Sequence, residues 1–326
     1  MIRTILPENK DQWLTLRTPN INSTDVSALF GISPYSTYFE LWHRKNNNQY
    51  VSIEPNERMK WGTALERAIA EEIAKEQGWE IRHMPQYMYD PDLRIGASFD
   101  FSIIETIDIS EENMLPGSEC VMPMSKDVET GLLEIKNVDS LVFKNDWIMK
   151  EDGSVEAPLH IEIQCQHQML VSGRPFLYIG ALIGGNRQIL IKRIADQRVH
   201  DAIKQKVAEF WASVEAGLEP KPDFEADAEF IKSLYSFAEP GTTMDVSNDA
   251  RIIGMAEEYE SLGDVIKTAE TRRDAIKAEL LTIIGTTEKA YGTNFTISAG
   301  VIGPSWVEAY ERKGYRSFKV TFKKAK

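Results

Sequence analysis

Gly96-Ala97-Ser98-Phe99-Asp100-Phe101 and Leu132-Leu133-Glu134-Ile135-Lys136 are the two stretches that decide the fold of this chain. Both are short and mostly apolar, which predicts two buried strands. Because side chains alternate between the faces of a strand, Ser98 and Asp100 should share one face, and Glu134 and Lys136 should share one as well. Charged groups on a buried face are costly unless they are paired or bind a cation. The two strands therefore predict a functional site on one side of a sheet.

The composition describes a large globular protein with an acidic surface. The chain has 326 residues, 42% of them hydrophobic, and a formal net charge of −13. That charge argues against a protein that coats nucleic acid through a broad basic surface, so any positive charge for DNA would have to line a groove or channel. Only Cys120 and Cys165 could form a disulfide, and we expect both to be reduced thiols.

No targeting or membrane segment is evident. No stretch approaches the ~20 consecutive apolar residues of a transmembrane helix, and residues 1–7 lack the features of a signal peptide. We therefore expect a protein of the bacterial or phage-infected host cytoplasm that has no contact with a membrane.

The order of predicted elements is α, three β, α, β, which favours an α/β (α+β) fold with a central mixed sheet flanked by helices. Helices are predicted over residues 23–31, 55–79 and 157–173, and strands over residues 79–89, 176–183 and 188–194. Ser23 or Thr24 would cap the first helix, and Gly78 and Gly173 would end the other two. Residues 105–130 contain Pro, Gly and acidic residues, and predict a long hairpin excursion or lid.

The character of the sequence changes near Asp223, so we expect a domain over residues 1–222 and a C-terminal accessory region over residues 223–326. In that region, apolar residues recur at alternating spacings of three and four, and only Arg273 breaks the pattern. The positions are Ile252, Met255, Tyr259, Leu262, Ile266, Ala269, Arg273, Ile276, Leu280 and Ile283. This heptad pattern predicts one long helix or a helical hairpin. A small β module should follow over residues 290–326, ending in a basic tail.

The acidic and basic residues suggest chemistry on a phosphodiester. Cleavage needs a nucleophilic water and charge neutralisation at phosphorus, and divalent ions held by carboxylates provide both. The metal ligands would be Asp100, Glu134, the main-chain carbonyl of Ile135 and Glu66, holding Mg²⁺ or Mn²⁺, with two ions expected per site. Lys136 would orient or help to deprotonate the water, and Gln164 would position either of them.

These assignments have ordinary alternatives. Glu-x-Lys often marks a solvated strand face, and Glu66 could equally be a salt-bridged structural residue. His160, Gln164 and His167 share a helix face, which predicts hydrogen bonding toward a polar cleft more than a zinc site, since no acidic zinc motif accompanies them. Gln166 competes with Gln164 for the role of catalytic amide. Arg17 and the hydroxyls after it could hold a phosphate, although capping is the commoner role.

At this point the chain resembles the PD-(D/E)xK nucleases, and within them the phage-type alkaline exonucleases of the lambda exonuclease and YqaJ recombinase family. The resemblance covers residues 10 to about 220. It rests on Trp13-x-x-x-Arg17, Ser23 to Gly31 with Ser33-Pro34-Tyr35, Gly62-x-x-x-Glu66, Gly96-Ala97-Ser98-Phe99-Asp100, Leu133-Glu134-Ile135-Lys136 and Gln164-Cys165-Gln166-His167-Gln168-Met169-Leu170-Val171-Ser172-Gly173. Phe99 departs from the proline usual in that motif, and the 105–130 excursion is long.

The resemblance implies a restriction-endonuclease-like core and a metal-dependent DNA exonuclease. Such an enzyme degrades linear double-stranded DNA 5′→3′ and leaves 3′ single-stranded overhangs for phage-type homologous recombination. The resemblance also implies a ring-shaped trimer and a single-strand annealing protein as partner. By position, Glu66, Asp100 and Glu134 would be metal ligands and Lys136 and Gln164 catalytic, whereas the 5′-phosphate pocket would comprise Arg17, Ser23 and Ser98.

Two other functions remain open. One is a structure-specific endonuclease or flap nuclease. The other is a catalytically idle module that binds DNA ends or an annealing protein, with the heptad region as its interaction surface. Retention of Asp100, Glu134 and Lys136 argues against an idle site.

Overall fold

The computed structural model describes residues 1–48, 56–108, 125–306, 316–318 and 320. The chain forms two compact units, Met1–Phe230 and Ile231–Lys326. The first unit contains every predicted site residue, and the two units are described separately below.

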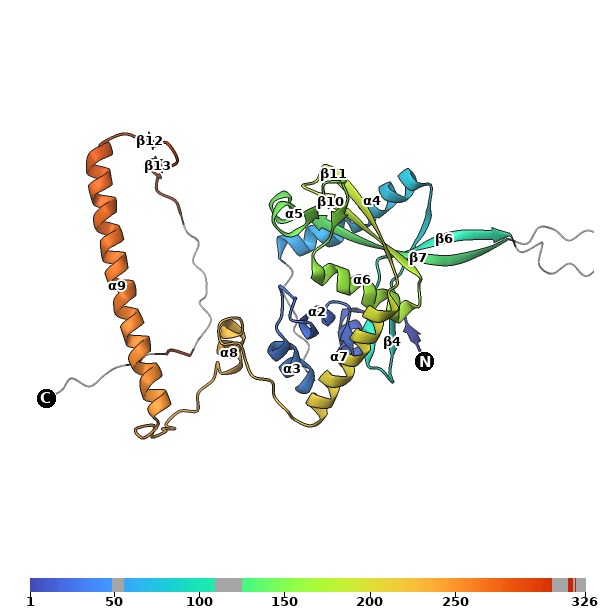
Figure 1. Ribbon diagram of the computed structural model, residues 1–326, viewed down its shortest axis with the longest axis horizontal. Helices are drawn as coiled ribbons and strands as arrows, with labels where there is room; N and C mark the ends of the chain where they lie inside the picture. Colours follow the sequence, from blue (N-terminus) through green and yellow to red (C-terminus); the bar gives the residue numbers. More distant parts are fainter. Residues whose placement is uncertain (49–55, 109–124, 307–315, 319, 321–326) are drawn as a thin grey trace, which may run out of the picture. The chain divides into compact units, whose positions relative to one another are not determined.

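A mixed five-stranded sheet lies at the centre of the first unit (Figure 1). Its strand order is β11 (Arg187–Ile194), β10 (Phe176–Ile183), β7 (Ser125–Val138), β6 (Phe101–Asp108) and β3 (Glu80–His83). Strands β7 and β10 are parallel, and the other neighbours are antiparallel. The predicted central mixed sheet and the predicted 176–194 hairpin are therefore confirmed.

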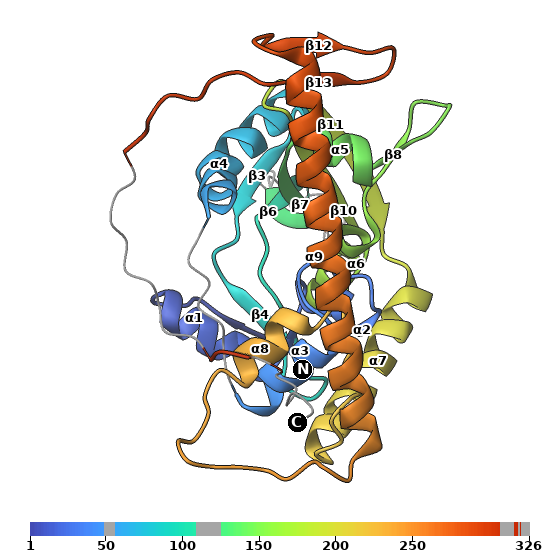
Figure 2. The ribbon, with the colours of Figure 1, turned by 90° about the vertical axis from the view of Figure 1, so that its left-hand side faces the viewer.

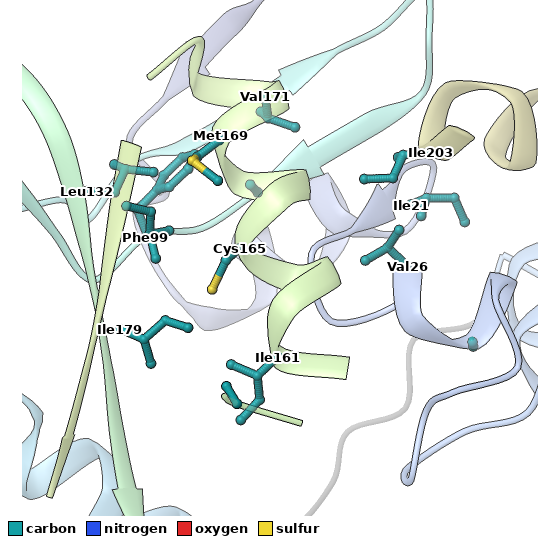
Figure 3. Close-up of a cluster of buried hydrophobic side chains, with 14 of the residues drawn as sticks. Ile21, Val26, Phe99, Leu132, Ile161, Cys165, Met169, Val171, Ile179 and Ile203 are labelled. Atoms are coloured by element: carbon teal, nitrogen blue, oxygen red, sulfur yellow. The ribbon is translucent and has the colours of Figure 1, made fainter. Parts of the chain in front are cut away.

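Each face of this sheet packs against one long helix. Leu133 and Ile135 of β7 share a buried cluster with Ile73 of α4 (Glu57–Gln77). Leu132 packs with Cys165 of α6 (Leu159–Ser172) on the opposite face (Figure 3). A Cβ at Gly180 of β10 would lie 2.4 Å from Cδ1 of Ile73, so the missing side chain lets α4 lie close to the sheet. Gly78 and Gly173 end the two helices with φ of +69° and +70°, as the sequence predicts.

A second sheet has four strands, in the order β1 (Arg3–Ile5), β4 (Tyr87–Asp90), β5 (Ile95–Ala97) and β2 (Ile21–Asn22). Its presence corrects two predictions. The single strand expected over 79–89 is divided into β3 and β4, which belong to different sheets, and Pro85 between them has no N–H for a ladder. The strand expected over 96–101 likewise ends at Ala97, and residues 98–100 carry the chain from one sheet to the other.

The remaining helices of the first unit are short except for one. They are α1 (Lys10–Arg17), α2 (Val26–Leu29), α3 (Tyr38–Asn46), α5 (Ser140–Asp146) and α7 (Gln197–Glu215), with the strand pair β8 (Ile148–Met149) and β9 (Val155–Glu156) between α5 and α6. The predicted N-cap of the 23–31 helix is wrong, because Asp25 occupies that position and α2 has a single turn. The side chain of Asp25 does not cap the helix but turns inward.

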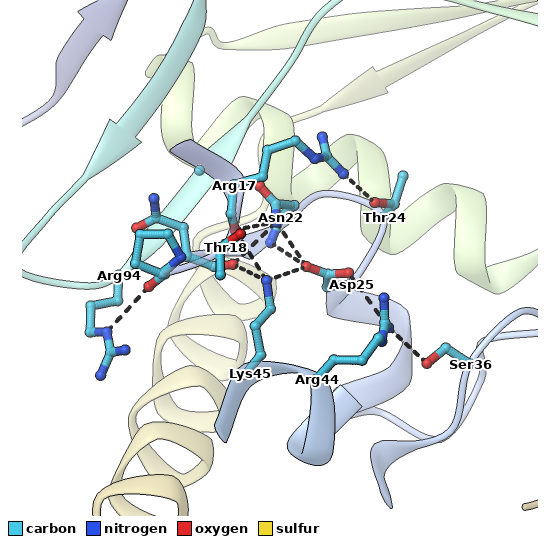
Figure 4. Close-up of polar contacts among 12 residues, drawn as sticks. Arg17, Thr18, Asn22, Thr24, Asp25, Ser36, Arg44, Lys45 and Arg94 are labelled. Carbon is cyan, nitrogen blue, oxygen red and sulfur yellow. Dashed lines mark hydrogen bonds and ion pairs between the residues drawn. The ribbon is translucent and has the colours of Figure 1, made fainter. Parts of the chain in front are cut away.

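A buried ion pair fixes the loop before α2 (Figure 4). Lys45 Nζ lies 3.1 Å from Asp25 Oδ2 and donates hydrogen bonds to the carbonyls of Arg17 at 3.1 Å and Asn20 at 2.6 Å. Burial would raise the pKa of Asp25, but its basic neighbours, Lys45 first among them, hold that pKa well below its usual range. The pair therefore anchors residues 17–25 as one structural element.

In the described part of the second unit, one long helix, α9 (Ala250–Ile284), precedes a hairpin of β12 (Lys289–Tyr291) and β13 (Thr296–Ser298). The short helix α8 (Ala228–Leu234) begins in the first unit and ends in the second. Of the two forms predicted for the heptad region, the structure has the continuous helix. The middle of the predicted 105–130 excursion, residues 109–124 with Cys120, lies outside the described residues, as does all of the basic tail except Val320. None of the described helices combines the length and the apolar character needed to span a bilayer.

The buried ring of His167 makes the stability of the fold depend on pH. Its ring is fully buried, and Nε2 donates to the carbonyl of Gly96 at 3.1 Å. Burial lowers the pKa of His167 to about 4, whereas an unfolded histidine titrates near ~6.5. As the pH falls, the unfolded state therefore takes up the extra proton before the folded state does. The contribution of His167 to the free energy of unfolding is fully present above pH ~6.5 and is lost as the pH drops toward 4, by about 3 kcal/mol in total.

Unfolding free energies measured from pH 7.5 to 4.5 test this prediction. The matched control is His167→Gln, whose amide can still donate to Gly96 but does not titrate. We expect the free energy of the variant to depend less steeply on pH, and equal slopes for both proteins would contradict the prediction.

Candidate functional site

A cavity of about 390 Å³ opens in the first unit where α1, α6, β7 and the 98–100 segment meet. Its walls combine acidic, basic, amide, hydroxyl and aromatic side chains. The lining residues are Trp13, Arg17, Ser23, Thr24, Tyr35, Ser98, Asp100, Glu134, Lys136, His160, Ile161, Gln164 and Gln168. The structure thus gathers around one cavity seven of the side chains that the sequence singles out.

Glu134 lies at the centre of the acidic end. Its Oε1 accepts hydrogen bonds from Lys136 Nζ and Gln164 Nε2, both at 2.6 Å, and its Oε2 accepts one from Gln168 Nε2 at 2.7 Å. The strand alternation of β7 puts Glu134 and Lys136 on the same side, as predicted. Burial would lower the pKa of Lys136, but Glu134 and Asp100 raise it above its usual range, so Lys136 is an ammonium.

Asp100 reaches the same place from the segment between the two sheets. Its Oδ2 accepts a hydrogen bond from the main-chain N–H of Ile135 at 2.7 Å. The pairing of β6 with β7 begins at Phe101 and Leu133, so the N–H and C=O of Ile135 on that edge have no strand partner. Burial first, and then Glu134 and Glu66, raise the pKa of Asp100 well above its usual value. The acidic end is therefore short of positive charge.

Glu66 is the predicted ligand that lies outside the cavity lining, although its charge still acts on Asp100. It lies half-buried on α4 and does not line the cavity, although Glu134 contributes after burial to raising its pKa. Within the described ranges, no group of three or more His, Cys, Asp or Glu side chains lies close enough together to hold a metal ion.

The chemistry of the remaining oxygen donors still fits a hard divalent cation. Among the described residues, the hydrogen bonds to the Asp100 carboxylate engage only Oδ2, so Oδ1 is available as a ligand. The carbonyl of Ile135 points to the same edge of β7 as its N–H. Together with Glu134, these oxygens match the ligands that Mg²⁺ and Mn²⁺ prefer, and a cation there would offset the excess negative charge.

The opposite end of the cavity is basic and hydroxylic. Arg17 Nη2 donates to Thr24 Oγ1 at 3.0 Å, and the guanidinium carbon lies 4.2 Å from the centre of the Trp13 ring. The indole N–H of Trp13 donates to Ser98 Oγ at 2.9 Å. Ser23 is buried beside them, and burial lowers the pKa of Arg17. Three hydroxyls and one guanidinium at this end form a set of groups suited to a phosphate.

The two ends are connected through Ser98 and Gln168. Gln168 Nε2 donates to the carbonyl of Ser98 at 3.1 Å as well as to Glu134, and Ser98 Oγ accepts from Trp13. Gln168 is a site residue that the sequence analysis did not assign. Its spacing of four residues from Gln164 on α6 is the signal that could have identified it.

The structure also separates the candidates on α6. His160 and Gln164 line the cavity, and the His160 ring packs edge-on against Tyr35 with a centroid distance of 5.7 Å. His167 shares their helix face but bonds to the carbonyl of Gly96 and does not line the cavity, so the predicted hydrogen bonding toward a polar cleft does not extend to this residue. The Gln166 side chain bonds to the main chain at Ile194 and Asp196, so of the two competing amides, Gln164 and Gln166, only Gln164 lines the cavity.

The chain is similar in sequence to one curated protein and in fold to several solved structures. Uncharacterized protein YqaJ of Bacillus subtilis (strain 168) is 26% identical over 278 residues, covering 83% of this chain and 78% of that protein. An alkaline exonuclease (LHK-Exo) from Laribacter hongkongensis has a TM-score of 0.46 and 18% identity, covering 68% of this chain and 100% of that one. A phage-related exonuclease from Haemophilus somnus 129PT has a TM-score of 0.39 and 11% identity, covering 60% and 94%.

The family model that matches is the YqaJ-like viral recombinase domain, over residues 12–175. The matched range contains both ends of the cavity, from Trp13 to Gln168. This chain belongs to the family of YqaJ-like viral recombinase domains.

Proposed function

We propose that this protein is a metal-dependent DNA exonuclease that degrades linear double-stranded DNA 5′→3′ and leaves 3′ single-stranded overhangs for recombination. The observation that carries the proposal is the cavity itself. Asp100, Glu134 and Lys136 line one end of it, and Arg17 and Ser98 line the other. Membership of the viral recombinase family agrees with a role in processing DNA ends.

Asp100, Glu134 and the carbonyl of Ile135 would hold Mg²⁺ or Mn²⁺, with two ions per site. Bound there, the metal supplies charge neutralisation at phosphorus and a more acidic water. Lys136 is held by Glu134 and lies 3.4 Å from Gln164 Oε1, so its ammonium has a fixed position beside the attacking water. There it orients the water and balances negative charge that develops on the phosphate.

Arg17, Ser23 and Ser98 would bind the terminal 5′-phosphate. A guanidinium and nearby hydroxyls give charge-assisted hydrogen bonds to phosphate oxygens. Binding of the 5′ end at this position would set the direction of digestion, because the strand then enters the acidic end with its 5′ terminus leading.

The same proposal implies which molecules this protein binds. They are double-stranded DNA ends, a single-strand annealing protein and further copies of this chain, with a trimer favoured. A ring of subunits would reconcile the net charge of −13 with DNA binding, since only the inner wall has to be positive.

The first prediction of the proposed activity concerns the substrate and the metal. With Mg²⁺, a linear 5′-phosphorylated duplex should release nucleotides from the labelled 5′ end, whereas a covalently closed circle should stay intact. A chelator should stop the reaction, and Mg²⁺ should restore it. Cutting of the circle would indicate an endonuclease, and absence of Mg²⁺ uptake in calorimetry would indicate an idle binding module.

Lys136→Ala should lower the rate of digestion by roughly 10²- to 10³-fold, because it removes the cation beside the scissile phosphate. The matched control is Lys206→Ala, which removes an exposed lysine of α7 and should retain full activity. Thermal unfolding of both variants establishes that they are folded. A Lys136→Ala protein that digests DNA as fast as the wild type would exclude this mechanism.

Arg17→Ala should reduce the preference for 5′-phosphorylated over 5′-hydroxyl ends by about 10- to 100-fold, the value of a charge-assisted hydrogen bond. The measurement is the ratio of digestion rates on the two ends. Lys10→Ala is the control, since Lys10 is an exposed cation on the same helix. An equal loss on both ends would show that Arg17 has a structural role only.

A further inference from the structure

The helix α9 exposes a seam of ten heptad positions from Ile252 to Ile283, which are apolar except for Arg273. No residue of α9 is buried, and seven of the apolar seam residues are between 38% and 73% exposed. These seven are Met255, Tyr259, Leu262, Ile266, Ile276, Leu280 and Ile283. Figure 2 shows α9 as one unbroken helix, and its seam is about 47 Å long.

The described part of the second unit covers little of this seam. One contact that does reach it is the edge-on packing of Phe318 against Tyr259, with a centroid distance of 5.5 Å, and Tyr259 remains 54% exposed. Alternating spacings of three and four are the pattern of helices that pair as coiled coils, because such a stripe stays in contact with a partner helix along its whole length.

Arg273 is the one charged seam position, and it disfavours a parallel pair in register. In that arrangement each seam residue meets its own copy, so two Arg273 side chains would be buried against each other. Arg272 and Lys277, which flank the seam five residues apart, would also meet as like charges across the parallel interface.

An antiparallel pair places the seam against itself without these conflicts. When one copy is reversed, the first position pairs with the last, so Ile252 lies opposite Ile283 and Met255 opposite Leu280. At the centre, the large Ile266 lies opposite the small Ala269. The seam is therefore complementary to its own reverse, which is the requirement for a two-fold interface between identical chains.

The same register provides a place for Arg273, which lies opposite Leu262 of the second copy. Glu258 of that copy is one helical turn from Leu262 on the same side of the helix. The long arginine side chain can lie along the leucine and bring its guanidinium to this carboxylate. In the antiparallel arrangement, the one charge in the seam thus gains an opposite charge from the second copy.

We propose that α9 is a self-association surface that pairs in an antiparallel manner with α9 of a second copy of this chain, in the register that aligns Met255 with Leu280. This pairing concerns the second unit and does not depend on the nuclease activity proposed for the first.

Disulfide trapping in the full-length chain tests both the occupant and the register. Met255→Cys and Leu280→Cys proteins, co-expressed and oxidised, should form a disulfide-linked dimer. Either variant by itself should show only the wild-type background, because each new thiol then faces a Met or Leu of the second copy. The control pair is Glu257→Cys with Ala278→Cys, which lie at the same height but on the outer face of the helix and should not be trapped.

Three outcomes would overturn the proposal. A dimer formed by Met255→Cys or Leu280→Cys without the other would show a parallel arrangement. Equal trapping of the control pair would show random collision. Background trapping in the Met255/Leu280 mixture would show that a second copy does not occupy the seam in this register.

Discussion

The structure of the site depends on one constraint, which is that Asp100 and Glu134 are held as neighbouring carboxylates in a buried place beside a single ammonium. Such an arrangement is stable only if other groups share the charge. Lys136, Gln164 and Gln168 donate to Glu134, and the N–H of Ile135 donates to Asp100. The ladder between β6 and β7 starts only at Leu133, so this N–H is free to make that bond. The sheet, α6 and the 98–100 segment are all required to complete the cluster.

Much of this arrangement could be predicted from local rules. Glycines in the left-handed conformation end α4 and α6, and strand alternation puts Glu134 and Lys136 together, because both features depend only on neighbouring residues. The predictions that were wrong concern features that depend on contacts between distant parts of the chain. A single run of alternating residues gave no sign that β3 and β4 enter different sheets. The predicted cap at Ser23 or Thr24 likewise gave no sign that Asp25 would take that position and pair with Lys45. Glu66 lies half-buried on α4 outside the cavity lining, a position that residue spacing alone does not determine.

The buried pair of Lys45 and Asp25 has a comparable role at the other end of the cavity. Lys45 donates to the carbonyl of Arg17 at the end of α1 and to that of Asn20 in the loop that leads to Ser23 and Thr24, and so holds this backbone in place. A buried ion pair of this kind is weak evidence for stability, because desolvation opposes it. Its effect here is geometric, since the groups that face the cavity from this loop cannot move independently of α3.

The contacts Arg17, Trp13, Ser98, Gln168 and Glu134 form an uninterrupted series from the basic end of the cavity to the acidic end. Because each neighbour in the series contacts the next, the protein itself sets the distance between the basic end and the acidic end of the cavity. On the proposed function, this series fixes the distance from the bound 5′-phosphate to the linkage that is cleaved. A strand anchored at one end would present the same backbone linkage to the other on every turnover, and the fragments removed would be uniform in length whatever their base sequence.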